Sequence, residues 1–309
     1  MTLNETPEET PAERTPRPAG RKRDPKGTKE RSETDRMLNR RQDVRVLSYP
    51  KSGRTWLGLM ATWYVAHAID RPDACWTVHK ALESMTPWRA ESYVNAVLEA
   101  RNKGRWAPLI QFRHFAAYSQ PYYQRPRIKK SGAERNIVLF RDPRDVVVSY
   151  YHHLVDYRRG RVRLGEGAPS KLPKSYSLPE FVYSETLGFR KIVAYMAAAA
   201  GWAERSAAPI VHYEDIRSDP AAGLRTFLVA CGIETPDQNL IARAVEACSF
   251  DRLKAAEAQS QGAAERKSLR VRKGVVGGHR EELDDREAEF MDAVLTEVGH
   301  PALARYLPN

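Results

Sequence analysis

One run of the chain constrains its fold more than any other, VRVLSYPKSGRTWLGLM at residues 44–60. Its β-branched and apolar start, Val44–Ser48, predicts a strand, the Pro, Ser and Gly of residues 49–54 predict a turn, and helical apolar spacing begins at Thr55. A strand, tight turn and helix in this order direct backbone N–H groups and the helix dipole into one cavity. Because Lys51 adds a full positive charge, the run predicts a phosphate or similar oxyanion site, the alternative being an ordinary turn with a solvated lysine.

The loop differs from the nucleotide triphosphatase pattern GxxxxGK[ST], since Lys51 here precedes Ser and Gly. It resembles the 5′-phosphosulfate-binding loop of sulfotransferases that use 3′-phosphoadenosine 5′-phosphosulfate (PAPS), where a Lys-Ser-Gly-x-Thr-Trp run follows the first strand. The resemblance implies that Lys51 stabilises the bridging oxygen as its bond to sulfur breaks. It also implies loop and stacking contacts from the residues that follow, namely Ser52, Gly53, Arg54, Thr55 and Trp56.

A second run, NIVLFRDPRDVVVSYYHH at residues 136–153, predicts another strand, polar turn and helix. Arg141 at the exit of this strand can hold an anion through two parallel N–H groups, and Ser149, eight residues further on, can donate a hydroxyl hydrogen bond. The alternative is that Arg141 pairs with Asp142 or Asp145 on the surface. The run resembles the 3′-phosphate-binding element of the same family, which implies that Arg141 and Ser149 bind the 3′-phosphate.

Two shorter segments continue the resemblance. IVHYEDI at residues 210–216 predicts a short strand and a turn, and a Tyr-Glu-Asp run after a strand in the family implies that Tyr213 lies near the adenosine. A core aromatic is the equal alternative for Tyr213. The Ser-Phe pair in ACSFDRL implies that Ser249 and Phe250 line the adenine pocket by ring stacking, although a Phe at a helix end is commonly buried for packing alone.

The Gly-punctuated basic segment LRVRKGVVGGHREE at residues 269–282 fits no helix or strand pattern. Adjacent cations and a Gly that admits close backbone approach suit a phosphate. The segment resembles the family's Arg-Lys-Gly-x-x-Gly loop over the 3′-phosphate, with matches at Arg272, Lys273, Gly274 and Gly277. It departs from the family at Arg270, where a Phe is usual, and at Gly277-Gly278-His279, where Gly-Asp-Trp is usual.

A general base for the acceptor hydroxyl is expected among the histidines, because a neutral imidazole accepts a proton near neutral pH. Our choice is His114, which ends the predicted strand PLIQFR at residues 108–113, where open α/β sheets bind ligands. The segment resembles the family's strand ending in Lys-Thr-His, with Phe112 replacing the Lys. His79 is the second candidate, while His152 or His153 is expected to orient the nearby helix.

The chain has 309 residues with 42% hydrophobic content, enough for one sizeable core. Residues 1–43 are rich in Pro, Thr and charge, so we expect a disordered polar tail before a sulfotransferase domain at 44–309. The resemblance implies an α/β fold of the P-loop-like kind, with three α/β/α layers around a mainly parallel sheet. Further helices are expected at residues 90–102, 178–202, 220–232 and 239–248.

The net charge of +11, from 50 Lys and Arg against 39 Asp and Glu, suits an acidic ligand, and no motif that reads a DNA groove accompanies it. Three widely spaced cysteines lack metal-ligand spacing, so we expect reduced thiols and no metal. Without a membrane-spanning apolar run or a secretory signal, a cytoplasmic location is expected.

The family resemblance implies in-line transfer of a sulfuryl group from PAPS to a hydroxyl of an alcohol, phenol or glycan, releasing adenosine 3′,5′-bisphosphate (PAP). Two alternatives remain at this point, a P-loop-type nucleotide kinase and a non-enzymatic binder of nucleotides or acidic polymers. The acceptor site would come from segments whose aromatic content suggests a ring or sugar face, residues 74–88, 115–127 and 158–177.

Overall fold

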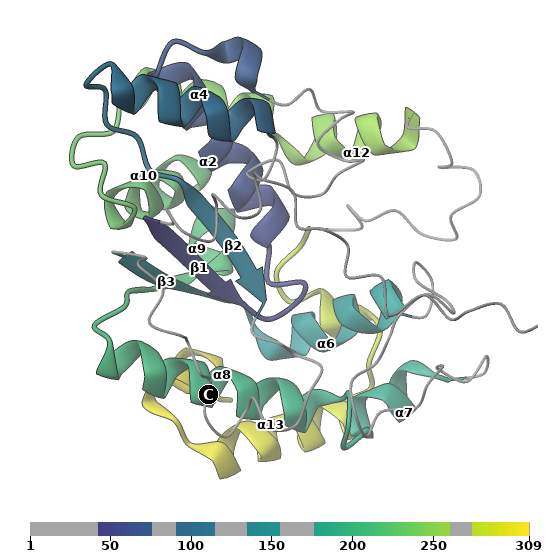
Figure 1. Cartoon of the computed structure of the whole chain (residues 1–309). Helices are drawn as coiled ribbons and strands as arrows, with labels where there is room; N and C mark the ends of the chain where they lie inside the picture. Colours follow the sequence, from purple (N-terminus) through teal and green to yellow (C-terminus); the bar gives the residue numbers. More distant parts are fainter. Residues whose placement is uncertain (1–42, 76–90, 115–134, 155–175, 260–273, 309) are drawn as a thin grey trace, which may run out of the picture.

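The computed structural model describes residues 43–75, 91–114, 135–154, 176–259 and 274–308. Within these ranges a parallel sheet lies between two groups of helices, which confirms the predicted three-layer α/β/α fold (Figure 1). Its strands run in the order β2-β1-β3-β4. Their bounds are β1 (Val44–Ser48), β2 (Ile110–His114), β3 (Arg135–Phe140) and β4 (Ile210–His212).

The sheet separates two hydrophobic cores because alternate residues of a strand point to opposite faces. In β3, Ile137 and Leu139 belong to one core, whereas Val138 and Phe140 belong to the other. The first core is covered by α2 (Arg54–Ala68), α4 (Glu91–Asn102), α10 (Pro220–Ala230), α11 (Gln238–Ala247) and α12 (Phe250–Gln259). The second is covered by α6 (Pro143–His152), α7 (Leu178–Tyr183), α8 (Phe189–Arg205) and α13 (Asp285–Val298).

Four shorter elements complete the described chain. One is α9 (Tyr213–Ser218), and the others are the 3-10 helices η1 (Pro72–Ala74), η4 (Gly278–Glu281) and η5 (Pro301–Tyr306). No helix in the described ranges combines the length and apolar character needed to cross a membrane.

The expected single helix over residues 178–202 is wrong, since the structure divides it into α7 and α8. The division occurs at residues 184–188, where the chain forms a turn in which the Gly188 N–H donates to the Ser184 carbonyl at 2.7 Å. A Cβ atom on Gly188 would lie 2.5 Å from the carbonyl oxygens of Phe181 and Ser184, so this turn requires glycine. The uniform apolar spacing of the sequence concealed the break.

Two other local boundaries also differ from expectation. The first helix begins at Arg54, directly after Gly53, rather than at Thr55. The segment IVHYEDI forms β4 and then a full helix, α9, instead of a turn. Tyr213 therefore opens a helix, which fixes the direction of its side chain more firmly than a turn would.

The strand order places a topological switch point between β1 and β3. The chain leaves β1 towards β2 on one side, and the next strand, β3, pairs with β1 on the other side. The carboxyl ends lie level, because Ser48 is in register with both His114 and Leu139. Open α/β sheets bind ligands at such a point, and both predicted anion-binding turns start here.

Candidate active site

The loop after β1 adopts an unusual backbone. Lys51 has φ 74° and Gly53 has φ 88°, both in the left-handed region. A non-glycine residue held in that region costs about 1–3 kcal/mol, and such strain is concentrated at functional loops. Gly53 also serves as the N-cap of α2, where no side chain caps the helix. The positive end of α2 therefore faces the loop, as the sequence predicted.

Tyr213 packs directly on this loop. A Cβ atom on Gly53 would lie 2.3 Å from Cδ2 of Tyr213, so the ring occupies the space that any other residue at position 53 would need. Tyr213 is buried and meets the Trp56 ring edge-on, with 6.0 Å between centroids. Burial raises the pKa of Tyr213, and the charges of Arg141 and Arg217 only partly offset it. The phenol therefore stays neutral at physiological pH.

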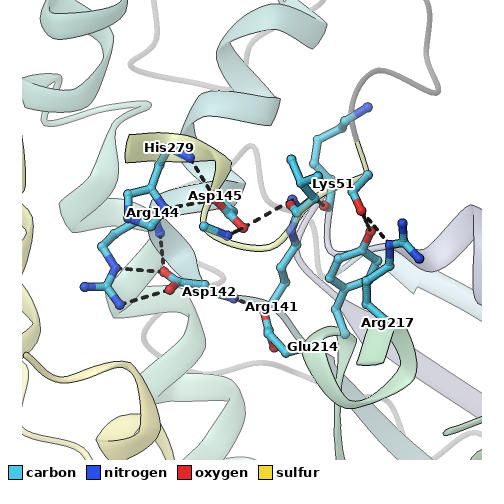
Figure 2. Close-up of polar contacts among 12 residues, drawn as sticks. Lys51, Arg141, Asp142, Arg144, Asp145, Glu214, Arg217 and His279 are labelled. Carbon is cyan, nitrogen blue, oxygen red and sulfur yellow. Dashed lines mark hydrogen bonds and ion pairs between the residues drawn. The ribbon is translucent and has the colours of Figure 1, made fainter. Parts of the chain in front are cut away.

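Arg141 connects the two ends of the site (Figure 2). Its Nη1 donates to the carbonyl of Lys51 at 3.3 Å, and its Nη2 donates to the carbonyl of Val275 at 3.2 Å. Its guanidinium carbon lies 4.6 Å from the ring centroid of Tyr213. The Nε atom is buried and has no hydrogen-bond partner within the described residues. Arg141 thus joins the loop after β1 to residues 274–279, the C-terminal loop.

The alternative of a surface pair at Arg141 is only half correct. Arg141 does pair with Asp145, at 3.4 Å, but the two side chains are 12% and 1% exposed. Asp142 pairs instead with Arg144 and caps α6 through the Arg144 N–H. The Arg141–Asp145 pair is consequently part of a buried site.

A pocket opens beside Arg141, with an empty volume of about 310 Å³ when the open solvent space at its mouth is counted. Ser149 lies on its wall, so the two residues predicted to bind the 3′-phosphate do face a common space. The other wall comes from the C-terminal loop. The pocket is lined in part by Arg141, Asp145, Ser149, Gly274, Val275 and His279.

Asp145 and His279, which both line this pocket, form a buried pair that the sequence reasoning did not identify. Asp145 Oδ1 accepts from the backbone N–H and the Nδ1–H of His279, at 3.1 and 2.9 Å, while Oδ2 accepts from the N–H of Gly277 at 2.9 Å. Burial raises the pKa of Asp145, but these hydrogen bonds and the charge of Arg141 outweigh it and lower the pKa overall. The carboxylate is therefore ionised at physiological pH.

Arg217 is a second residue that the sequence reasoning missed. Its Nε donates to the carbonyl of Gly274 at 2.6 Å, and its guanidinium lies 5.7 Å from the Phe250 ring and 5.9 Å from the Trp56 ring. Arg217 is one helical turn after Tyr213, whose hydroxyl lies 3.5 Å from the same carbonyl. The i, i+4 relation would have revealed Arg217 if α9 had been recognised as a helix.

Gly274 and Phe250 approach each other closely. A Cβ atom on Gly274, which has φ 63°, would lie 2.2 Å from the Phe250 ring. Ser249 precedes α12 and donates its N–H to the carbonyl of Glu246 at 3.1 Å. Together with the position of Arg217 near both rings, this contact brings Trp56 and Phe250 next to the C-terminal loop.

A supporting layer lies beneath Arg141. Glu214 accepts from the N–H of Asp142 at 2.7 Å and from the Tyr306 hydroxyl at 3.2 Å. Burial raises the pKa of Glu214, and the Asp142 N–H offsets part of that increase. These contacts fix the turn from which Arg141 projects.

Several predicted residues fall outside what the structure describes. Arg272, Lys273 and His79 belong to segments that are not described, as do residues 76–88, 115–127 and 158–175 of the proposed acceptor segments. His114 ends β2 in register with Ser48, at the carboxyl ends of the strands, but only its backbone is described. His152 pairs with Glu282 at 2.5 Å, consistent with an orienting role. Within the described residues, no cluster of three or more His, Cys, Asp or Glu side chains could hold a metal.

Comparison with known proteins gives a consistent picture. The family model described as Sulfotransferase domain matches residues 41–301. Flavonol 4′-sulfotransferase of Flaveria chlorifolia is 24% identical over 277 residues, which cover 84% of this chain and 79% of that protein. Flavonol 3-sulfotransferase of Flaveria bidentis is 23% identical over 273 residues, which cover 82% of this chain and 81% of that protein.

Solved structures agree at the level of the fold. Mouse sulfotransferase SULT7A1 complexed with PAP superposes with a TM-score of 0.52 and 20% identity, covering 86% of this chain and 89% of that chain. Retinol dehydratase in complex with androsterone and inactive cofactor PAP gives a TM-score of 0.53 and 16% identity, covering 86% and 83%.

Proposed function

Because the chain belongs to the sulfotransferase family, we propose that it transfers a sulfuryl group from PAPS to a hydroxyl group of an acceptor and releases PAP. The observation that carries this proposal is the position of Arg141. It bonds the carbonyls of Lys51 and Val275, so one side chain spans the predicted 5′-phosphosulfate loop and the predicted 3′-phosphate loop. A ligand with two separated anionic groups fits this arrangement. Neither the kinase nor the non-enzymatic alternative accounts for the family match.

The described residues fit a nucleotide phosphate. Arg141 leaves its buried Nε without an acceptor among the described residues, and a buried donor without a partner is costly. A phosphate oxygen would supply that acceptor, and Ser149 on the pocket wall can add a hydroxyl donor. The rings of Trp56 and Phe250, with Arg217 near both, suit a purine by stacking.

In the proposed mechanism, PAPS supplies the activated sulfuryl group. Lys51 neutralises the negative charge that develops on the bridging oxygen as the S–O bond to the phosphate breaks. His114 accepts the proton of the acceptor hydroxyl while its oxygen forms the new S–O bond. Ser52, Gly53, Arg54 and Thr55 hold the 5′ end through the loop and the start of α2.

We also propose phenolic hydroxyls as the first acceptors to test, because the two curated relatives are named as flavonol sulfotransferases. Their identities of 24% and 23% leave the acceptor itself to experiment. A panel of phenols, alkyl alcohols and glycans with labelled PAPS would identify the class that is used.

Thermal unfolding in the presence of PAP tests the proposal before any acceptor is known. At a hundredfold excess over its dissociation constant, PAP should stabilise the protein by about 2.7 kcal/mol without Mg²⁺. ATP with Mg²⁺ should stabilise it less. No shift with millimolar PAP would contradict the proposed function.

The catalytic assignments require transfer assays. Lys51→Ala should lower the transfer rate by about a hundredfold or more, whereas Lys103→Ala, at an exposed lysine paired with Glu99, should leave the rate unchanged. His114→Ala should lower the rate by about 10²–10⁴-fold. Full activity in the His114 variant would move the base to His79.

A further inference from the structure

The C-terminal loop is held on α6 and α9 mainly by contacts to its backbone. The carbonyl of Gly274 accepts from Arg217, and the carbonyl of Val275 accepts from Arg141. The N–H groups of Gly277 and His279 both donate to Asp145. Figure 2 shows Asp145 between the loop and Arg141. Asp145 therefore contacts both Arg141 and the C-terminal loop, which together line the pocket.

A carboxylate on the wall of an anion-binding pocket requires an explanation, because its charge repels phosphate. Asp145 is 1% exposed and accepts four N–H groups, two on each oxygen. Because all four donors belong to the protein, they compensate the negative charge of the carboxylate within the protein. The geometry indicates a structural link within the site and not a ligand contact.

His279 supplies the only side chain of this loop that pairs with Asp145 in the described chain, through Nδ1. It stands at the third position of Gly277-Gly278-His279, where the sulfotransferase pattern carries Trp. The imidazole is 6% exposed. A buried polar pair thus replaces the usual aromatic residue at this point of the loop.

We propose that Asp145 and His279 are positioning residues for the 3′-phosphate of the nucleotide. Their pair fixes the loop of residues 274–279 against α6, so Arg141, Ser149 and the loop face one pocket before the nucleotide binds. The assignment rests on the proposed function, since it presumes that this pocket receives the 3′-phosphate. The loop after β1 takes no part in the pair and serves the 5′ end.

The test compares PAP with adenosine 5′-monophosphate, which lacks the 3′-phosphate, by titration calorimetry on the full chain. Asp145→Asn puts an amide NH₂ where one carboxylate oxygen accepts two donors, whichever way the amide is turned. It should weaken PAP binding by roughly 10- to 100-fold and leave the binding of the monophosphate nearly unchanged. In transfer assays, KM for PAPS should rise while kcat stays within a few-fold.

His279 offers a variant pair that separates positioning from general packing. His279→Leu removes the Nδ1 donor and should weaken PAP binding in the same selective way. His279→Asn retains an N–H near the position of Nδ1 and should restore most of the affinity. Glu287→Gln, at a buried carboxylate in the capping box of α13, serves as the control and should leave both affinities unchanged.

The possible results distinguish this inference from the proposed function. If the unmodified protein binds no PAP, the proposed function fails. If it binds PAP and the Asp145 and His279 variants bind it equally well, only the positioning role fails. An equal loss of affinity for both nucleotides would also overturn the inference, because it would indicate general destabilisation. Should Asp145→Asn not fold, the Leu and Asn variants of His279 give the answer alone.

Discussion

The contact between Gly53 and Tyr213 leads to a quantitative prediction. Gly53→Ala places a Cβ atom 2.3 Å from Cδ2 and 2.8 Å from Cε2 of the tyrosine ring, well inside van der Waals contact. The left-handed backbone at φ 88° adds about 1–2 kcal/mol for a residue with a Cβ atom. Repacking the buried ring adds about 1–3 kcal/mol. We therefore expect the free energy of unfolding to fall by about 2–5 kcal/mol.

Gly104→Ala provides a matched control for this substitution. Gly104 has φ 78°, but a Cβ atom there would meet nothing within 4 Å. Gly104→Ala should lower the free energy of unfolding only by the cost of the left-handed backbone, about 1–2 kcal/mol. Urea unfolding of both variants then isolates the contribution of the tyrosine contact as a difference.

The displacement of the Tyr213 ring in Gly53→Ala should also impair ligand binding. A shifted Tyr213 ring withdraws its face from the Arg141 guanidinium and its hydroxyl from the carbonyl of Gly274. Calorimetric titration with PAP should show weaker binding in Gly53→Ala and unchanged binding in Gly104→Ala. Equal stability losses in the two variants, or full PAP affinity in Gly53→Ala, would refute the reasoning.

Two further predictions concern strain and pH. Lys51→Gly and Lys51→Ala should both lose transfer activity. The free energy of unfolding of the Gly variant should exceed that of the Ala variant by about 1 kcal/mol, because glycine adopts the left-handed backbone without strain. Equal stability of the two variants in urea unfolding would argue against that strain. Burial, aided by the charge of Arg305, lowers the pKa of His212 to about 4 from 6.5, so the unfolded state binds the proton first and stability falls as pH decreases from 6.5 to 4. The full pKa shift corresponds to about 3 kcal/mol in the free energy of unfolding, which partial exposure of His212 reduces to about 1–2 kcal/mol. His212→Gln should remove this part of the dependence of the unfolding free energy on pH.

The sequence predicted the elements that carry a local signature. The run at residues 44–60 contains its own strand, turn and cap chemistry, so β1 and the loop follow from neighbouring residues. The same holds for Arg141, which leaves β3 immediately before the Pro143 that opens α6. Because parallel strands end at one edge of a sheet, predicting both turns was enough to place them near each other.

Tertiary contacts with no local signature were not predictable in this way. Asp145 and His279 are separated by 134 residues, and neither lies in a pattern that identifies the other. The break before α8 depends on carbonyl oxygens that crowd Gly188, whereas the flanking apolar spacing reads as one continuous helix. Arg217 was missed because its role follows from α9 being a helix.

The way the C-terminal loop is held also explains which of its residues the sequence could specify. Arg141, Asp145 and Arg217 bind carbonyl and N–H groups of this loop, and every residue except proline carries both groups. Val275 and Val276 are accordingly 40% and 49% exposed, with no side-chain requirement visible in these contacts. Two positions of the loop are fixed in type: Gly274, where the Phe250 ring excludes a Cβ atom, and His279, whose Nδ1 donates to Asp145. The loop is therefore recognised in sequence by its glycines and basic residues, while its placement depends on side chains that lie elsewhere in the chain.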